Sequence, residues 1–178
     1  VYAALSRPTI GHMDPDFIAI MDECKKDLQS LLHTGNRLTI PVSGTGSAGM
    51  EACVANLVEP GNTVLVCVNG VFGTRLADCA TRQGAAVDTL DFPWGTPVDV
   101  AQVKKQCAQK AYDLIAVVHA ETSTGVCNPV QEIGAVIDRD RSLYLVDAVT
   151  SFGGMAVNVD GLGIDALYSG TQKCLSCP

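Results

Sequence analysis

The sequence predicts an α/β fold of three layers, in which a mostly parallel sheet lies between two layers of helices. Two observations support this prediction. Short, almost continuously apolar runs recur along the chain, as in strands that are covered on both faces. Helix-like stretches with one apolar face separate most of these runs, and this alternation is typical of parallel sheets with flanking helices.

The first expected element is a helix that begins near Pro15. Asp14 is suited to cap its N-terminus, and Pro15 fits the first helical position. Apolar residues then recur at three- and four-residue spacing, which predicts one apolar face. Gly35 is expected to end the helix in a left-handed cap. The predicted apolar face consists of Phe17, Met21, Cys24, Leu28 and Leu31.

The later elements are expected to alternate along the chain. Strands are predicted at residues 38–42, 63–68, 86–90, 114–118, 143–146 and 164–168. Helical faces are predicted around residues 50–58, 72–80, 100–107 and 130–137, with Asp99 and the Asn128–Pro129 pair opening the last two. Residues 92–97, which include two prolines and a glycine, are expected to form a loop. No helix separates the last two strands, so at least one pairing need not follow simple winding.

Length and charge limit the class of protein. The 178 residues suit a substantial core, which we divide into an N-terminal segment with the first helix, residues 1–36, and a larger domain, residues 37–178. The net charge of −7 argues against nucleic acid as the partner. No apolar run approaches the roughly 20 residues of a membrane span, and no signal peptide opens the chain. A cytoplasmic protein is expected, with organellar targeting left open because both ends look truncated.

The cysteines are expected to be free thiols. Most of the eight lie within apolar stretches, where cysteine acts as a small hydrophobic residue. A chain with a core of this size does not need disulfides. Cys174 and Cys177 form a single C-x-x-C without a second pair at zinc spacing, so no metal site is expected.

The glycine-rich turn at residues 43–49 is the first candidate binding feature. It is expected to follow a strand and to open a helix, whose N-terminus offers unpaired N–H donors and a favourable dipole. Its glycines allow the backbone to approach an anion closely, and Thr45 and Ser47 can add hydroxyl donors. The turn is therefore predicted to bind a phosphate, although a tight turn without a ligand stays open at this point.

A dinucleotide site is the main alternative for this turn, because Gly44, Gly46 and Gly49 fit the G-x-G-x-x-G pattern. That pattern also requires an acidic residue about 20 positions later, at the end of the second strand. The strand in question ends in Val68-Asn69-Gly70, without a carboxylate. The dinucleotide interpretation is therefore disfavoured.

A carboxylate and an amine complete the candidate site. Asp147 follows the apolar run 143–146, at the strand end where open α/β sheets collect ligands. Lys173 lies in a polar turn after the final strand, and partial withdrawal from water would lower the pKa of its amine. Phosphate turn, carboxylate and amine are the groups that pyridoxal 5′-phosphate requires: the carboxylate keeps the ring nitrogen protonated and the amine forms the Schiff base.

Six segments then resemble one family. Residues 7–12, 43–49, 69–73, 119–125, 146–151 and 168–173 are similar to the class V aminotransferases, which are fold type I pyridoxal phosphate enzymes. The likeness is closest to the alanine–glyoxylate and serine–glyoxylate (serine–pyruvate) group. It implies the large cofactor-binding domain of such an enzyme, ending before the small C-terminal domain and before the arginine that binds the substrate carboxylate.

The resemblance also implies residue roles. Lys173 would be the Schiff-base lysine and Asp147 the partner of the pyridine nitrogen. Phe72 would stack on one face of the ring, where relatives often carry tryptophan, and Val149 would pack on the other. His119 and Glu121 suggest a general base, but a structural His119 is favoured. The remaining implied cofactor contacts are Thr45, Gly46 and Ser47 in the phosphate cup, Thr122 near the phenolic oxygen, and Gln172.

The activity implied by the resemblance is transfer of an amino group from alanine or serine to glyoxylate or pyruvate. Small amino acids and 2-oxo acids would be the substrates, and a homodimer is implied by analogy. Alternatives within the family are ureidoglycine–glyoxylate and aminoethylphosphonate–pyruvate aminotransferases and cysteine desulfurases, the last of which would need a catalytic cysteine beyond residue 178. A fragment without catalytic activity is the remaining alternative.

Overall fold

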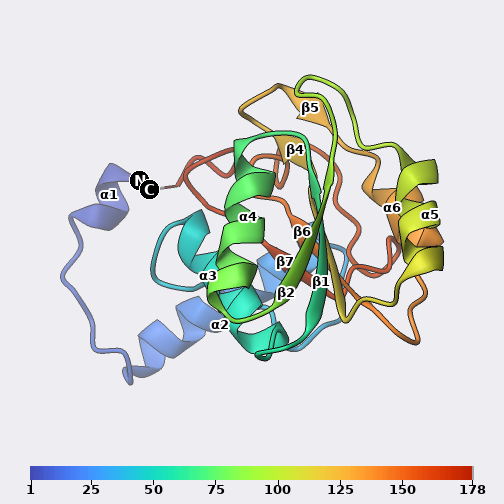
Figure 1. Cartoon of the computed structure of the whole chain (residues 1–178). Helices are drawn as coiled ribbons and strands as arrows, with labels where there is room; N and C mark the ends of the chain where they lie inside the picture. The colour runs from blue at the N-terminus through green and yellow to red at the C-terminus, as the bar shows by residue number, and fades with distance from the viewer. Residues whose placement is uncertain (178) are drawn as a thin grey trace.

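Five parallel strands form the central sheet of the computed structural model, which describes residues 1–177 (Figure 1). Their spatial order is β2 (Ala86–Asp91), β1 (Thr63–Val68), β3 (Leu114–Val118), β6 (Leu143–Asp147) and β7 (Ala166–Tyr168). A short antiparallel pair, β4 (Ala120–Glu121) and β5 (Val126–Cys127), follows β3. The parallel sheet confirms the predicted class.

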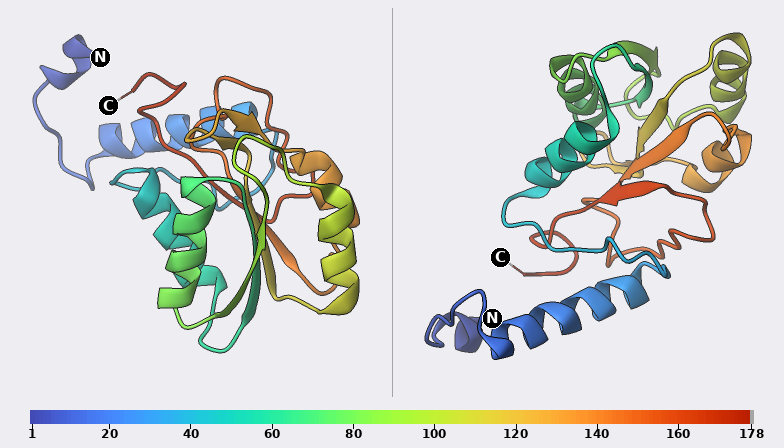
Figure 2. Two further views of the ribbon diagram at one scale, coloured as in Figure 1. Left: turned by 45° about the horizontal axis from the view of Figure 1, so that its top comes forward. Right: turned by 90° about the horizontal axis from the view of Figure 1, so that it is seen from below.

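Helices cover both faces of the sheet, as Figure 2 shows. Helices α3 (Gly46–Leu57) and α4 (Val71–Arg82) pack on one face. Helices α5 (Val100–Gln109) and α6 (Val130–Val136) pack on the other. The chain begins with α1 (Tyr2–Leu5) and α2 (Pro15–Leu31), which lie beside this layered body (Figure 2). The three predicted layers are therefore confirmed.

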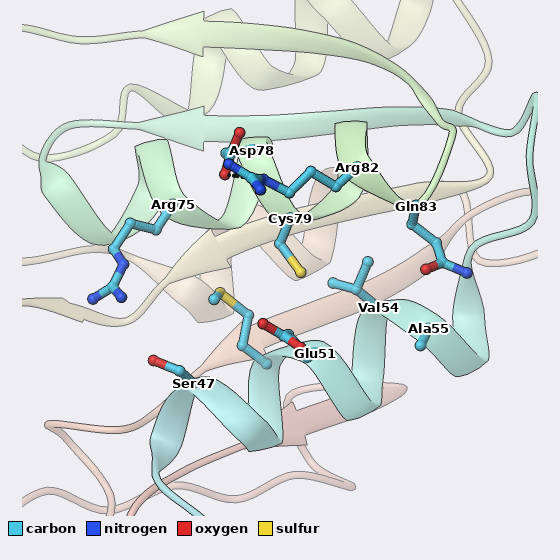
Figure 3. Close-up of a pocket in the computed structure, with 10 residues that line it drawn as sticks. Ser47, Glu51, Val54, Ala55, Arg75, Asp78, Cys79, Arg82 and Gln83 are labelled. Atoms are coloured by element: carbon cyan, nitrogen blue, oxygen red, sulfur yellow. Dashed lines mark hydrogen bonds and ion pairs between the residues drawn. The ribbon is translucent and has the colours of Figure 1, made fainter.

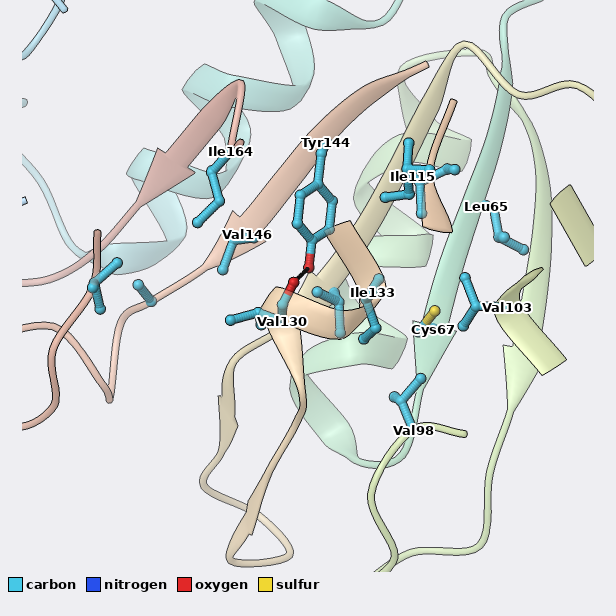
Figure 4. Packing of buried hydrophobic residues seen from close by; sticks show 14 of the residues in the cluster. Leu65, Cys67, Val98, Val103, Ile115, Val130, Ile133, Tyr144, Val146 and Ile164 are labelled. Carbon is cyan, nitrogen blue, oxygen red and sulfur yellow. Dashed lines mark hydrogen bonds between the residues drawn. The ribbon is translucent and has the colours of Figure 1, made fainter. Parts of the chain in front are cut away.

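Successive side chains along each central strand point to opposite faces of the sheet and pack into two separate cores. Leu65 and Cys67 of β1 face α5 and α6, while Val64 and Val66 face α3 and α4. The first core also holds Tyr144, whose hydroxyl donates a 3.0 Å hydrogen bond to the Val130 carbonyl (Figure 4). Both faces of the central strands are thus buried, which explains why apolar residues in them do not alternate with polar ones.

Two predicted helix starts are confirmed by their caps. The Asp14 carboxylate accepts a 2.9 Å bond from the Asp16 amide at the start of α2. The Asp99 carboxylate accepts a 2.9 Å bond from the Ala101 amide at the start of α5. Each side chain satisfies one of the amides that a helix start leaves unpaired.

The predicted end of α2 is wrong. The helix stops at Leu31, and His33, with φ of 48°, takes the left-handed conformation that was expected at Gly35. Gly35 instead donates its amide to a carboxylate oxygen of Asp160 at 3.0 Å. The chain turns earlier because this contact, together with the Thr34 hydroxyl bond to Asp160, fixes the segment against a distant loop.

The apolar face of α2 is buried only in part. Phe17, Met21 and Leu28 are half-buried, and Leu28 packs against the first core. Cys24 is exposed and Leu31 is 52% exposed, contrary to the continuous buried face that the spacing predicts. Amphipathic spacing reports which side of a helix is apolar, but the neighbours of that side are set by tertiary structure.

The strand predicted at residues 38–42 is also wrong. Leu38, Ile40 and Val42 are 79%, 58% and 49% exposed, and the segment pairs with no strand among the described residues. The amide of Leu38 bonds instead to the Asn36 side chain. A strand needs a neighbour for its amides and carbonyls, and β7 ends the sheet on this side without pairing with residues 38–42.

The other predicted strands form within one or two residues of their expected bounds. Strands β6 and β7 pair in parallel without an intervening helix, as the sequence allows. Residues 92–97 form the expected loop, and all eight cysteines are free. Over residues 1–177, the helices are too short or too polar to cross a bilayer. The division of the chain at residues 36 and 37 stays a prediction.

Candidate functional site

The candidate residues gather at one edge of the sheet, where the carboxyl ends of the parallel strands meet. Phe72 lies at the start of α4, directly after β1. Thr122 lies in the turn of the β4–β5 hairpin that follows β3. Asp147 ends β6, and Lys173 lies in the turn after β7. The topology thus brings together residues as far apart in sequence as Phe72 and Lys173.

Asp147 is a buried carboxylate with two fixed hydrogen bonds. One oxygen accepts a 2.9 Å bond from the Val149 amide, and the other accepts a 2.8 Å bond from the Tyr168 hydroxyl. Burial raises the pKa of Asp147 above its ordinary value, and these two bonds oppose the rise only in part. The site therefore holds a carboxylate whose charge would be stabilised by a nearby cation.

Tyr168 was not recognised as a site residue from the sequence, where it reads as the last apolar residue of a strand. The register of β6 and β7 places it directly beside Asp147. Burial and the Asp147 carboxylate both raise the pKa of its hydroxyl, which keeps the hydroxyl a hydrogen-bond donor. The aromatic residue at the end of the strand was the available signal, but the register that gives it a role is a tertiary property.

The predicted phosphate turn lies next to Asp147. A side chain added at Gly46 would place its Cβ only 2.9 Å from a methyl carbon of Val149, so only glycine fits at this close approach. Thr45 is the N-cap residue of α3, and its side chain makes no capping bond. The helix therefore begins with amides that lack intrahelical partners, as an anion site requires. The strand expected before this turn is absent, which removes a further requirement of the dinucleotide motif.

Two threonines join the hairpin to the segment after Asp147. The hydroxyl oxygens of Thr122 and Thr150 lie 2.5 Å apart. Thr122 is exposed and Val149 is half-buried, so both side chains line an accessible surface. Phe72, which lies at the start of α4 directly after β1, is also half-buried. The structure thus places three of the predicted cofactor contacts around the same strand edge as Asp147.

Lys173 lies in an exposed turn that returns toward the Asp147 segment. The Ser169 hydroxyl donates to the Ala148 carbonyl at 3.0 Å, and the Cys174 thiol donates to the Thr150 carbonyl at 3.2 Å. These bonds flank Lys173 on both sides. Among residues 1–177, its amine makes no ion pair with a carboxylate. Gln172 is exposed and its side chain folds back over Gly170, and its predicted contact with the cofactor stays a prediction.

Glu121 has a structural role that the sequence did not reveal. Its fully buried carboxylate accepts bonds from the amides of Phe72 and Gly73 at 3.2 and 3.1 Å, and from the Ser123 hydroxyl at 2.6 Å. It therefore caps the N-terminus of α4 from another part of the chain. The positive end of the helix dipole favours a negatively charged side chain at this position. This use accounts for Glu121 without a role as a general base.

His119 is buried directly after β3, and its backbone amide donates to the Asp147 carbonyl at 2.9 Å. Burial lowers the pKa of its imidazole, which favours the neutral ring. Its Nδ1 atom has no hydrogen-bond partner among the described residues. The structural role that the sequence favoured for His119 stays a prediction.

We predict that Glu121→Ala in the full-length protein lowers the free energy of unfolding by about 2–4 kcal/mol, because buried amides at the start of α4 lose their acceptor. The urea midpoint measures this loss. Glu51→Ala is the matched control, since Glu51 is exposed on α3 and its loss should change stability by less than about 0.5 kcal/mol. Equal midpoints for the two variants would contradict the capping role.

A groove of about 330 Å³ lies beside the site, between α3 and α4 (Figure 3). Ser47 lies at one end, but neither Asp147 nor Lys173 lines the groove. Its walls carry exposed charged residues, and Arg82 pairs with Asp78 at 2.7 Å across one helical turn. The groove therefore adjoins the phosphate turn without being part of the Asp147 site.

Comparison with known proteins gives one consistent result. The family model described as Aminotransferase class-V matches residues 1–178. The chain is 41% identical over 178 residues to the (S)-ureidoglycine–glyoxylate transaminase of Bacillus subtilis (strain 168), and 42% identical to the alanine–glyoxylate aminotransferase of Rattus norvegicus. All of this chain is covered in both comparisons, and it spans 43% of each relative.

Solved structures agree with these relatives. The crystal structure of the alanine–glyoxylate aminotransferase from Nostoc sp. superposes with a TM-score of 0.96 at 44% identity. The superposition covers 99% of this chain and 47% of that one. The chain therefore spans less than half the length of the relatives that it matches.

The parallel sheet and the edge that carries Asp147 and Lys173 define the large domain of a fold type I aminotransferase. Within that class, the chain belongs to the class V aminotransferase family. Members of this family use pyridoxal 5′-phosphate. The residues present fit that group. The turn at the start of α3 has amides without intrahelical partners, which suit the phosphate, and the buried Asp147 carboxylate suits a protonated ring nitrogen.

Proposed function

We propose that the full-length protein is a pyridoxal phosphate-dependent aminotransferase that moves the amino group of alanine or serine to glyoxylate or pyruvate. The observation that supports this most strongly is the position of Asp147 at the end of β6. The start of α3 packs on Val149 on one side of it, and the turn of Lys173 is tied to the same segment on the other.

Each predicted residue has a proposed task toward the cofactor, which when bound supplies an electron sink for the amino acid's α-carbon. Asp147 would hold the proton on the pyridine nitrogen, because that cation would offset the burial that raises the pKa of the Asp147 carboxyl. Thr45, Gly46 and Ser47 would bind the phosphate through amides and hydroxyls at the start of α3.

The remaining tasks concern the ring and the lysine. Phe72 and Val149 would enclose the two faces of the ring, and Thr122 would contact its phenolic oxygen. Gln172, directly before Lys173, would also reach the cofactor. The Lys173 amine would attach the cofactor and then carry the proton between the substrate α-carbon and the cofactor.

The choice of glyoxylate as acceptor is supported by the relatives, whose names join it with alanine or with (S)-ureidoglycine as donor. A ureidoglycine donor is therefore the second candidate, favoured by the Bacillus subtilis relative. Both donors are α-amino acids, so the same Lys173 and Asp147 chemistry would serve either one.

An amino-donor screen with the full-length protein tests the proposal. With pyridoxal phosphate present, we expect glyoxylate to be converted to glycine as alanine is converted to pyruvate or serine to hydroxypyruvate. (S)-Ureidoglycine is measured in parallel, and aspartate serves as a donor with a different side chain. Absence of glycine with every donor would contradict the proposed reaction.

We also propose a homodimer, by analogy with the family. Light scattering after size exclusion of the full-length protein measures the assembly directly. A mass of one chain over the micromolar range would contradict it.

A further inference from the structure

Residues 170–177 contact the rest of the protein through Leu175, which packs against the first core, and through one side-chain hydrogen bond. Their backbone forms local turns, in which the amides of Ser176 and Cys177 bond to the carbonyls of Lys173 and Thr171, each at 3.0 Å. Most of their side chains are exposed. Among the described residues, the Cys174 thiol makes the one side-chain hydrogen bond from this segment to the rest of the protein. Cys174 is therefore the tether next to Lys173.

The Cys174 thiol bonds to a residue of the candidate site. It is the carbonyl of Thr150, three residues after Asp147, whose own hydroxyl contacts Thr122. On the other side of Lys173, the Ser169 hydroxyl bonds to the Ala148 carbonyl. The lysine thus lies between two side-chain bonds to one segment, the segment that begins at Asp147.

A pair of glycines makes room for the tether. A Cβ at Gly154 would lie 2.7 Å from the Cys174 sulfur, and a Cβ at Gly153 would lie 2.8 Å from a methyl carbon of Leu175. Gly153 also has φ of 85°, which disfavours any other residue. Cys174, although exposed, and Leu175 therefore pack closely against two positions where any side chain would collide with them unless they moved; this surface is called the notch below.

We propose that Cys174, seated against Gly154, is a positioning residue that holds the Lys173 amine at its working distance from the Asp147 segment. This inference rests on the proposed function, since Lys173 needs a fixed position only if it reacts. Catalysis is sensitive to such placement, because a shift of about 1 Å can cost roughly a hundredfold in rate. The thiol acts here as a hydrogen-bond donor and a packing group, with no redox step.

Four variants of the full-length protein test this role. Cys174→Ala removes the donor, Cys174→Ser keeps a donor, and Gly154→Ala inserts a methyl group against the sulfur. The double variant Gly154→Ala with Cys174→Ala removes the sulfur that the methyl group would meet and leaves Cβ atoms 3.4 Å apart. Cys24→Ala and Gly35→Ala are matched controls, because Cys24 is exposed and a Cβ at Gly35 would meet no atom within 4 Å.

The first readout needs no cofactor. In the apo-protein, hydrogen exchange of the peptide covering residues 170–177 should be roughly fivefold faster in Cys174→Ala and Gly154→Ala, and close to the parent rate in Cys174→Ser. Unchanged exchange in both Cys174→Ala and Gly154→Ala would overturn the tether. This result stands even if the protein proves to bind no pyridoxal phosphate, so the two proposals can fail separately.

The second readout separates positioning from general stability. In the holoenzyme, Cys174→Ala should lower kcat roughly tenfold and Gly154→Ala up to about a hundredfold, with KM changed less than about twofold. Cys174→Ser should recover most of the loss seen in Cys174→Ala. The double variant should rise from the Gly154→Ala rate to about the Cys174→Ala rate, because it still lacks the thiol donor. Faster exchange with unchanged kcat, or loss in the controls of the same size, would overturn the positioning role.

Discussion

Replacing Lys173 with alanine in the full-length protein should abolish the visible absorption of bound pyridoxal phosphate and lower turnover by at least roughly 10²–10⁴-fold. The amine is proposed both to attach the cofactor and to move the substrate proton, and proton transfer by a positioned group alone contributes a factor of this size. Absorption spectroscopy and steady-state kinetics measure the two effects.

Borohydride reduction of the parent protein identifies the attached side chain independently of turnover. The label should map to the peptide that contains Lys173, and Lys110→Ala is the matched control because Lys110 pairs with Asp88 at 2.7 Å, far from the site in the fold. A label on another lysine, or normal turnover in Lys173→Ala, would contradict the assignment.

Replacing Asp147 with asparagine should lower kcat by roughly a thousandfold while pyridoxal phosphate still binds. The change removes the charge but keeps the shape of the side chain, including an oxygen that can accept the Val149 amide. A carboxylate about 4 Å from a cation contributes about 4 kcal/mol at an effective dielectric constant of 20, which corresponds to this loss in rate. Comparable losses of cofactor affinity and turnover would instead make Asp147 a structural residue.

The same variant has a pH signature in the apo-protein. Because the pKa of Asp147 is raised on folding, the native state holds a proton that the unfolded state has already released. Stability of the parent should therefore fall as pH rises from the ordinary aspartate range through this raised pKa. Asp147→Asn lacks this contribution, so its stability relative to the parent should increase over that interval. A difference that does not change with pH would contradict the raised pKa.

Much of the central fold follows from the sequence because its signals are local. The apolar runs at residues 63–68 and 114–118 predict strands covered on both faces, and strands form there with those bounds. Asp14 and Asp99 mark helix starts because a capping carboxylate acts on amides two residues away. The run at residues 38–42 has the same local character, yet within residues 1–177 no strand pairs with it.

The residues of the site also fall into two groups, those that the sequence identifies and those that only the tertiary structure reveals. Asp147, Lys173 and the turn at residues 43–49 could be identified from the sequence, because their residue types and order along the chain suit one cofactor. Tyr168 against Asp147, Glu121 at the start of α4 and Cys174 in its notch depend on strand register and on contacts between distant segments. By itself the sequence determined which groups the protein offers to a ligand and which runs become buried strands. Only the tertiary structure decided which of those groups touch, because hydrogen bonds and packing between segments far apart in the chain form only when the sheet is assembled.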